Sequence, residues 1–164
     1  MRRIARLVIL SCLVALILAM GATTSLATTP SGSSAQFTYR ATLDPYHFDS
    51  NDFKIFQKDR QDIVMRQLTL APGGSAGWHF HPGPSFVIVT QGTLSLYQAS
   101  DPTCTAQRFG PGEGFVEAPG EDHVHIARNE GTTPLVIVIT FLDVPIGRPF
   151  RLDAPAPQPD NCSF

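Results

Sequence analysis

The stretch Gly77–Ser85, "GWHFHPGPS", sets two histidines two positions apart and follows them with a turn rich in proline and glycine. On a β-strand, side chains two positions apart project from the same face, with Cα atoms about 6.6 Å apart, whereas on a helix they diverge. His79 and His81 can therefore converge on one ion if they lie on a strand. The stretch predicts a strand that ends in a tight turn and presents two imidazoles on one face.

Similar strand signals recur along most of the chain. Short runs rich in β-branched and aromatic residues alternate with turn residues at a spacing of about ten residues, and a helical period is nearly absent. The predicted strands cover 37–43, 53–57, 62–70, 75–81, 85–91, 93–99, 106–110, 114–118, 123–129 and 134–142. Such spacing predicts an all-β fold, either a sandwich or a barrel.

Residues 1–27 differ from the rest of the chain. "MRRIAR" is basic, "LVILSCLVALILAMGA" is an apolar run without charge, and Ser25-Leu26-Ala27 supplies small residues at a cleavage point. This pattern predicts a signal peptide and a secreted or periplasmic protein. The apolar run has 16 residues, fewer than the roughly 20 that a membrane-spanning helix needs, and an uncleaved anchor is the alternative.

The charge of the chain argues against nucleic acid and membrane surfaces as partners. The chain has 12 Lys and Arg against 14 Asp and Glu, and the predicted leader holds three of the arginines and no acid. The mature chain then has 9 basic and 14 acidic side chains, a net charge of about −5. Its Lys and Arg are scattered, so we expect no nucleic-acid partner and no membrane attachment in the mature form.

Cysteine usage agrees with export. Cys12 lies in the leader, which leaves Cys104 and Cys162, an even number in an oxidising compartment. We expect these two to form a disulfide that ties the end of the chain to the domain. Two free thiols are the alternative.

The length of the chain fits one domain with a substantial core. Residues 28–36, "TTPSGSSAQ", have the composition of a linker and no apolar period, so we expect them to be flexible. The barrel domain is expected at 37–150, followed by an extended, proline-rich C-terminal tail at 151–164.

A second His-x-His pair, His123 and His125, repeats the first pattern. Three or four imidazoles inside a barrel would form a site for a divalent transition metal, and iron, manganese, zinc, nickel and copper all accept imidazole nitrogen. The residues alone leave the metal's identity open. They also leave open a half-buried structural pair of histidines that binds no metal.

The spacing around the first pair resembles the first motif of the cupin superfamily. Gly73, five residues, His79-x-His81, three residues, Ser85, six residues and Gly92 match it at every position except Ser85, where the family usually has glutamate. The wider run resembles a group of small bacterial cupin-domain proteins. The resemblance covers about 62–141 and implies a small antiparallel β-barrel of jelly-roll type, a double-stranded β-helix.

A second cupin motif follows in a looser form. Gly114, a turn at Pro119-Gly120, His125 and Asn129 stand where the family has its second motif, although the usual Pro-x-Gly is shifted. Cupins bind a divalent metal with both histidines of the first motif, its glutamate and the histidine of the second. The resemblance therefore implies His79, His81 and His125 as metal ligands.

The missing glutamate leaves the fourth ligand open, because the serine that replaces it is a poor metal ligand. Glu117, in the strand that leads to the second motif, is the first substitute, unless its side chain points to solvent. His123 is the other candidate, unless it lies in a turn. We consider both as less certain ligands than the three histidines.

These observations predict an exported single-domain cupin that binds a divalent transition metal and acts on a small molecule. Whether it is an enzyme is left open; a metal-dependent oxygenase or isomerase is the form that catalysis would take. The alternative is a non-catalytic barrel that binds a small ligand, with the metal structural or absent. Cupins often pair through edge strands, so a homodimer is a further expectation, with 37–43 available for exchange between subunits.

Overall fold

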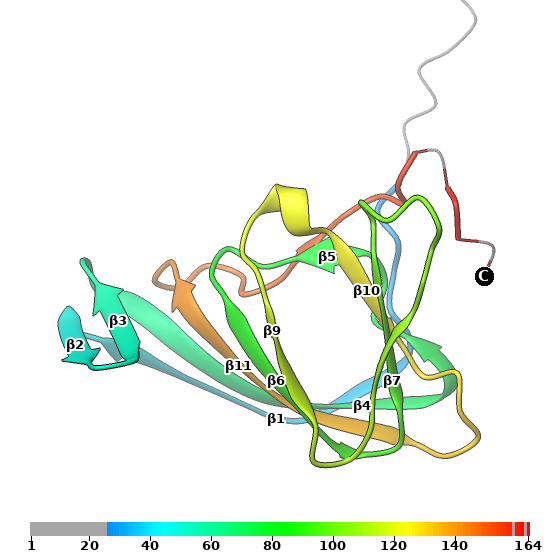
Figure 1. Cartoon of the computed structure of the whole chain (residues 1–164), viewed down its shortest axis with the longest axis horizontal. Helices are drawn as coiled ribbons and strands as arrows, with labels where there is room; N and C mark the ends of the chain where they lie inside the picture. The colour runs from blue at the N-terminus through cyan, green and yellow to red at the C-terminus, as the bar shows by residue number, and fades with distance from the viewer. Residues whose placement is uncertain (1–25, 159, 163) are drawn as a thin grey trace, which may run out of the picture.

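The computed structural model describes residues 26–158, 160–162 and 164, which form a nearly closed antiparallel β-barrel of the jelly-roll type (Figure 1). In these residues the only helical element is the 3-10 turn η1 (Glu121–His123). The strands are β1 (Ser31–Leu43), β2 (Tyr46–Ser50), β3 (Phe53–Gln57), β4 (Gln61–Ser75), β5 (His79–Phe80), β6 (Ser85–Gln91), β7 (Leu94–Gln98), β8 (Gln107–Phe109), β9 (Gly114–Glu117), β10 (His125–Arg128), β11 (Leu135–Val144) and β12 (Leu152–Asp153). The predicted all-β barrel is confirmed.

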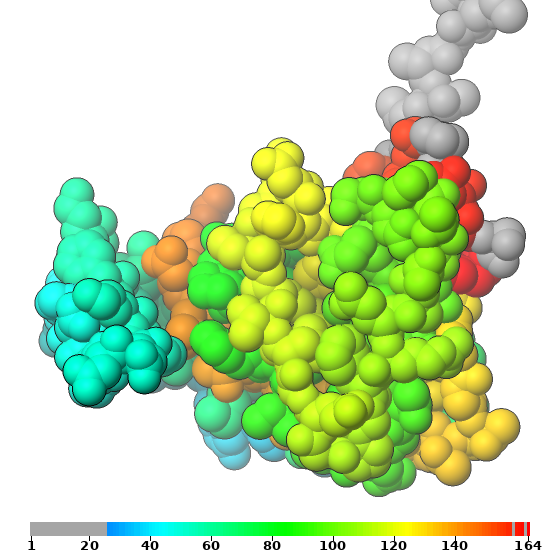
Figure 2. Space-filling model, in the orientation of Figure 1, coloured from blue at the N-terminus to red at the C-terminus, as the bar shows by residue number. Residues whose placement is uncertain are grey.

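The main sheet follows the order β12-β5-β10-β4-β11-β6-β9, with β1 added to β4 and with β7 bridging β10 and β8. This order brings strands that are distant in sequence side by side, so β5 and β10, each with histidine, become neighbours. The β2–β3 hairpin forms a separate sheet and stands away from the barrel (Figure 2). The site therefore depends on pairing across the barrel.

Buried side chains alternate with more exposed ones along the strands, and the buried ones form the core. In β11 every second residue is buried from Leu135 to Phe141, and the partner residues Val87 and Val89 of β6 face the same interior. Burying one such side chain contributes about 1.5–3 kcal/mol to folding. The period of two thus decides which side chains enter the barrel.

The segment expected to be a flexible linker is largely a strand. β1 begins at Ser31 and pairs with β4 from Ser31–Ser75 to Leu43–Gln61. Backbone groups make these hydrogen bonds, so the polar side chains of "SGSSAQ" can stay exposed while the strand covers the edge of β4. The strand pairs within its own chain, which leaves exchange between subunits a prediction.

The C-terminal tail folds back over the barrel. Leu152 and Asp153 of β12 pair with β5, and a disulfide joins Cys104 to Cys162, as expected. Cys162 is buried in a cluster with Trp78 and Tyr97. The tail is therefore part of the wall beside the histidines.

The predicted signal peptide lies almost entirely outside the described residues and stays a prediction. Within the part of the chain that the structure describes, no helix has the length and apolar character needed to cross a membrane. The disulfide is the structural feature that fits an oxidising compartment.

Candidate metal centre

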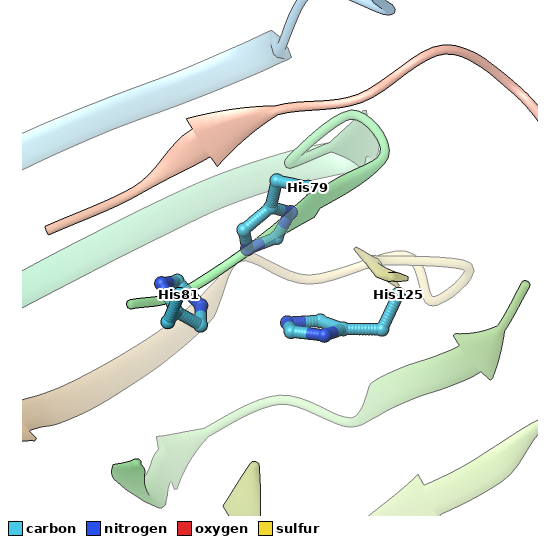
Figure 3. A group of neighbouring side chains, drawn as sticks. All are labelled: His79, His81 and His125. Atoms are coloured by element: carbon cyan, nitrogen blue, oxygen red, sulfur yellow. The ribbon is translucent and has the colours of Figure 1, made fainter. Parts of the chain in front are cut away.

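Three histidines from two parts of the barrel meet inside it. His79 opens β5, His81 follows that strand, and His125 opens β10 directly opposite His79 in the β5–β10 pairing. Their imidazoles point toward one another (Figure 3), and one ligand atom from each lies within 4.8 Å of the other two. The three residues are 6%, 2% and 1% exposed, respectively. This arrangement is a candidate site for one metal ion.

Each imidazole is oriented by a backbone carbonyl. In every case Nδ1 lies 2.8 Å from a carbonyl oxygen: that of Gly77 for His79, that of Phe150 for His81 and that of His123 for His125. A neutral imidazole that donates from Nδ1 keeps its lone pair on Nε2, which is the form that binds a metal. The hydrogen bonds to the three carbonyls thus turn the three Nε2 atoms into the barrel.

Glu117 turns into the same interior rather than to solvent. It ends β9, is 9% exposed, and places Oε2 3.3 Å from His81 Nε2 and Oε1 3.2 Å from His125 Nε2. Ser85, directly across the β6–β9 pairing, donates a hydrogen bond from Oγ to Glu117 Oε2. A carboxylate therefore lies against two of the three inward-facing nitrogens.

His123 lies in η1 with its side chain exposed. It contributes its carbonyl oxygen to His125, and its imidazole is outside the group of three. The turn η1 ends at this residue and β10 begins only at His125, so the two-residue period of a strand, which would align the two side chains, does not apply.

The electrostatics of the site favour a cation. Burial lowers the pKa of His79 well below its ordinary value, and His125, Arg151 and His81 lower it further. Burial alone would raise the pKa of Glu117 and lower that of His125. The contacts with His125 and His81 outweigh burial and lower the pKa of Glu117, whereas the contacts with Glu117 and with the carbonyl of His123 raise the pKa of His125. An ionised carboxylate beside three imidazoles is a suitable ligand set for a divalent transition metal, which would take the place of the proton on His125.

A buried ring nitrogen without a hydrogen-bond partner also fits a metal site. His125 Nε2 is buried and makes no well-aligned hydrogen bond with any residue that the structure describes, although Glu117 Oε1 is 3.2 Å away. A buried nitrogen without a partner is costly in a folded protein. A cation held between the carboxylate and the imidazoles would satisfy it.

A cavity with a volume of about 50 Å³ opens beside the histidines. Apolar side chains form most of its wall: Leu68, Ile137, Ile139, Phe141 and Phe150. The charged side chains that line it are Arg66, Glu117 and Arg151. The site thus has room for a small molecule next to the metal ligands.

Comparison with known families identifies a cupin domain in the chain. Residues 66–143 match the model of the cupin domain, and this region contains the three histidines and Glu117. The antiparallel barrel and the buried histidines fit this assignment. Residues 66–143 are therefore a cupin domain.

Among curated proteins, the chain is 32% identical over 104 residues to germin-like protein subfamily T member 3 of Arabidopsis thaliana. The aligned region covers 60% of this chain and 45% of that protein. The match thus spans less than half the length of the relative. A solved structure of an oxalate oxidase is 25% identical, with coverage of 48% of this chain and 40% of that one and a TM-score of 0.42. A double-stranded β-helix protein of Klebsiella pneumoniae is 22% identical, with coverage of 68% and 84% and a TM-score of 0.45.

Sequence reasoning did not identify the arginines of the cavity. Val64, Arg66 and Leu68 are two residues apart on β4 and so share the face of the strand that points into the barrel. A charged residue at such a position was the feature of the sequence that could have indicated a role for Arg66 in the cavity. Arg151 belongs to the predicted tail, and no local pattern indicates that the tail returns to the barrel.

Proposed function

We propose that this protein is an exported cupin that binds one divalent transition metal through His79, His81, His125 and Glu117 and acts on a small molecule. The observation that carries the proposal is the convergence of three buried imidazoles, each with Nδ1 held by a carbonyl and Nε2 directed inward. The predicted leader and the disulfide support export.

Glu117 takes over the role of the glutamate that the family has at the position of Ser85. The two residues are cross-strand partners, so their side chains reach the same part of the interior from neighbouring strands. The backbone position that carries the glutamate side chain then differs by one strand spacing, about 4.8 Å, between the two arrangements. A glutamate side chain is long enough to bridge that distance, as its contacts with His81 and His125 indicate.

Three imidazoles and one carboxylate leave coordination positions for a substrate or water. Iron, manganese, nickel, copper and zinc all accept this ligand set, so the identity of the ion is a matter for measurement. A bound metal of this kind supplies Lewis acidity, or redox chemistry when it is iron, manganese or copper. The chain's own residues orient the ligand and exclude water, since the cavity wall is mainly apolar.

Metal content tests the proposal directly. We expect about one equivalent of metal per chain in protein purified without a histidine tag, measured by mass spectrometry, and loss of that metal in His81→Ala. His47→Ala, which changes an exposed histidine on β2, is the matched control and should keep the metal. Wild-type protein without bound metal, with no affinity for added Fe²⁺, Mn²⁺ or Zn²⁺, would contradict the proposal.

Catalysis is the form of the proposal that the open cavity favours, as an oxygenase or an isomerase. The competing form is a binding protein whose metal fixes one group of a ligand. Oxygen consumption or product formation by the metal-loaded protein would identify an enzyme. Thermal stabilisation by a small molecule that is recovered unchanged would identify a binding protein.

A further inference from the structure

Two arginines line the cavity that contains the metal ligands. Arg66 of β4 lies at its wall together with Arg151, which directly precedes β12. A buried or half-buried guanidinium normally has a carboxylate partner, because removing its charge from water is costly. The partners of these two arginines therefore bear on what the cavity binds.

Arg66 has no acidic partner among the described residues. Its guanidinium lies over an aromatic face, with Cζ 5.6 Å from the centre of the Phe150 ring. Its Nε is buried and makes no hydrogen bond with any described residue. Burial lowers the pKa of Arg66, yet a guanidinium stays charged at neutral pH. This leaves a charged donor at the cavity wall without an acceptor.

Arg151 is only partly paired. Its Nη2 donates to the carbonyl of Ala76 at 2.6 Å and lies 2.7 Å from Asp153 Oδ1, while its Nε is buried without a partner among the described residues. Burial lowers its pKa, Asp153 opposes that effect, and the positive charge of Arg66 adds to it. The two guanidinium groups therefore lie close enough to repel each other.

Phe150 connects the arginines to the metal ligands. Its ring faces Arg66, its carbonyl accepts the hydrogen bond from His81 Nδ1, and it precedes Arg151 in the chain. With a divalent cation bound, that cation and two guanidinium groups would face only two carboxylates, that of Glu117 and that of Asp153, which pairs with Arg151. The excess of positive charge calls for an anion.

We propose that this cavity binds a small organic carboxylate, with its carboxylate group on the guanidinium of Arg66, within reach of Arg151, and its apolar part against Ile137 and Ile139. The inference rests on the proposed function, because the ligand would lie beside the metal. A volume of about 50 Å³ corresponds to roughly three to five water molecules and so to about four to six non-hydrogen atoms. The planar fork of arginine matches a carboxylate in two parallel hydrogen bonds.

A carboxylate fits this cavity better than a phosphate. A phosphate dianion requires many donors, such as backbone N–H groups at a glycine-rich loop, and the wall here is mainly aliphatic and aromatic. Glu117 would also repel a second negative charge. The apolar wall instead provides a surface for a short carbon chain.

Titration calorimetry on the metal-loaded protein tests the inference with propionate and with propionamide, which has the same shape without the charge. We expect propionate to bind at least about tenfold more tightly than propionamide. Arg66→Met should weaken propionate binding by about tenfold to a hundredfold and leave propionamide unaffected. Arg66→Lys, which keeps the charge without the fork, should give an intermediate loss. Arg60→Met, at an exposed arginine, is the control and should bind as wild type does.

Metal content and thermal unfolding are measured on every sample, so the two proposals fail in different ways. Equal binding of propionate and propionamide, tighter binding of inorganic phosphate, or an unchanged affinity in a folded, metal-loaded Arg66→Met would overturn the anion site and leave the metal site standing. Wild-type protein that takes up no metal would overturn the proposed function. Arg66-dependent propionate binding in that metal-free protein would still support the anion site.

Discussion

Ser85 and Glu117 lie directly opposite each other in the pairing of β6 with β9, and the serine hydroxyl donates a hydrogen bond to the glutamate carboxylate. The carboxylate in turn approaches His81 and His125. A carboxylate therefore lies beside the histidines as in the cupin motif, but it comes from β9 and not from the position of Ser85 on β6.

This relationship predicts that the carboxylate can be moved back. Glu117→Ser should lower metal affinity by at least about tenfold, since it removes a ligand as well as its charge. Ser85→Glu combined with Glu117→Ser should recover most of that loss, because the new glutamate reaches the same interior from β6. Competition with a chelator of known affinity would measure all three proteins.

The single variant Ser85→Glu completes this set. It places two carboxylates side by side in a buried site, so we expect a lower melting temperature in the metal-free protein, where the repulsion is unscreened. Wild-type metal affinity in Glu117→Ser would show that the carboxylate is not a ligand. Failure of the double variant to regain affinity, with its fold intact, would show that the two positions are not equivalent.

Most of the strands and the pairing of His79 with His81 could be predicted from local patterns, whereas His125 was assigned as their partner through the resemblance to the second cupin motif. Alternation along "PLVIVITFL" marks the buried face of β11, and the His-x-His spacing of His79 and His81 survives in the fold. The inward turn of Glu117 could be named only as one of two alternatives, because it depends on the β6–β9 register. Arg151 and the strand at 31–36 depend on contacts with distant segments, which no local period encodes.

A backbone prediction concerns Gly77, whose carbonyl holds His79. Its φ is +72°, and a Cβ at this position would lie 2.6 Å from the carbonyl oxygen of Thr28. Gly77→Ala should therefore lower the melting temperature and weaken metal binding. The added methyl group must displace either the strand or the Gly77 carbonyl that accepts the hydrogen bond from His79 Nδ1. Gly73→Ala is the matched control, since its φ is +74° but its Cβ would meet no atom within 4 Å. Equal effects of both substitutions on metal affinity would contradict this explanation.

The disulfide predicts a large contribution to stability. Cys104 and Cys162 are 58 residues apart, and the chain-entropy estimate for a loop of this size is about 4 kcal/mol. Replacing both cysteines with serine should lower the urea midpoint of unfolding accordingly. Wild-type protein treated with a reducing agent should show a similar shift. An unchanged midpoint in both cases would mean that the tail is held by its other contacts, such as the β5–β12 pairing.

The last prediction concerns pH and Asp62, a buried carboxylate at the start of β4. The N–H of Gly147, the hydroxyl of Thr42 and the guanidinium of Arg40 all donate to it, at 2.9, 2.7 and 2.6 Å, and together they lower its pKa below its ordinary value. A lowered pKa in the folded state stabilises the protein fully above the ordinary value and is lost as the pH falls from there through the lowered value. Asp62→Asn removes this titration, so the difference in melting temperature between wild type and variant should be constant above about pH 5 and should shrink toward pH 3. Asp59→Asn, at an exposed position, is the control. A difference that does not change with pH would show that Asp62 stabilises the fold only through its shape and hydrogen bonds, and not through its charge.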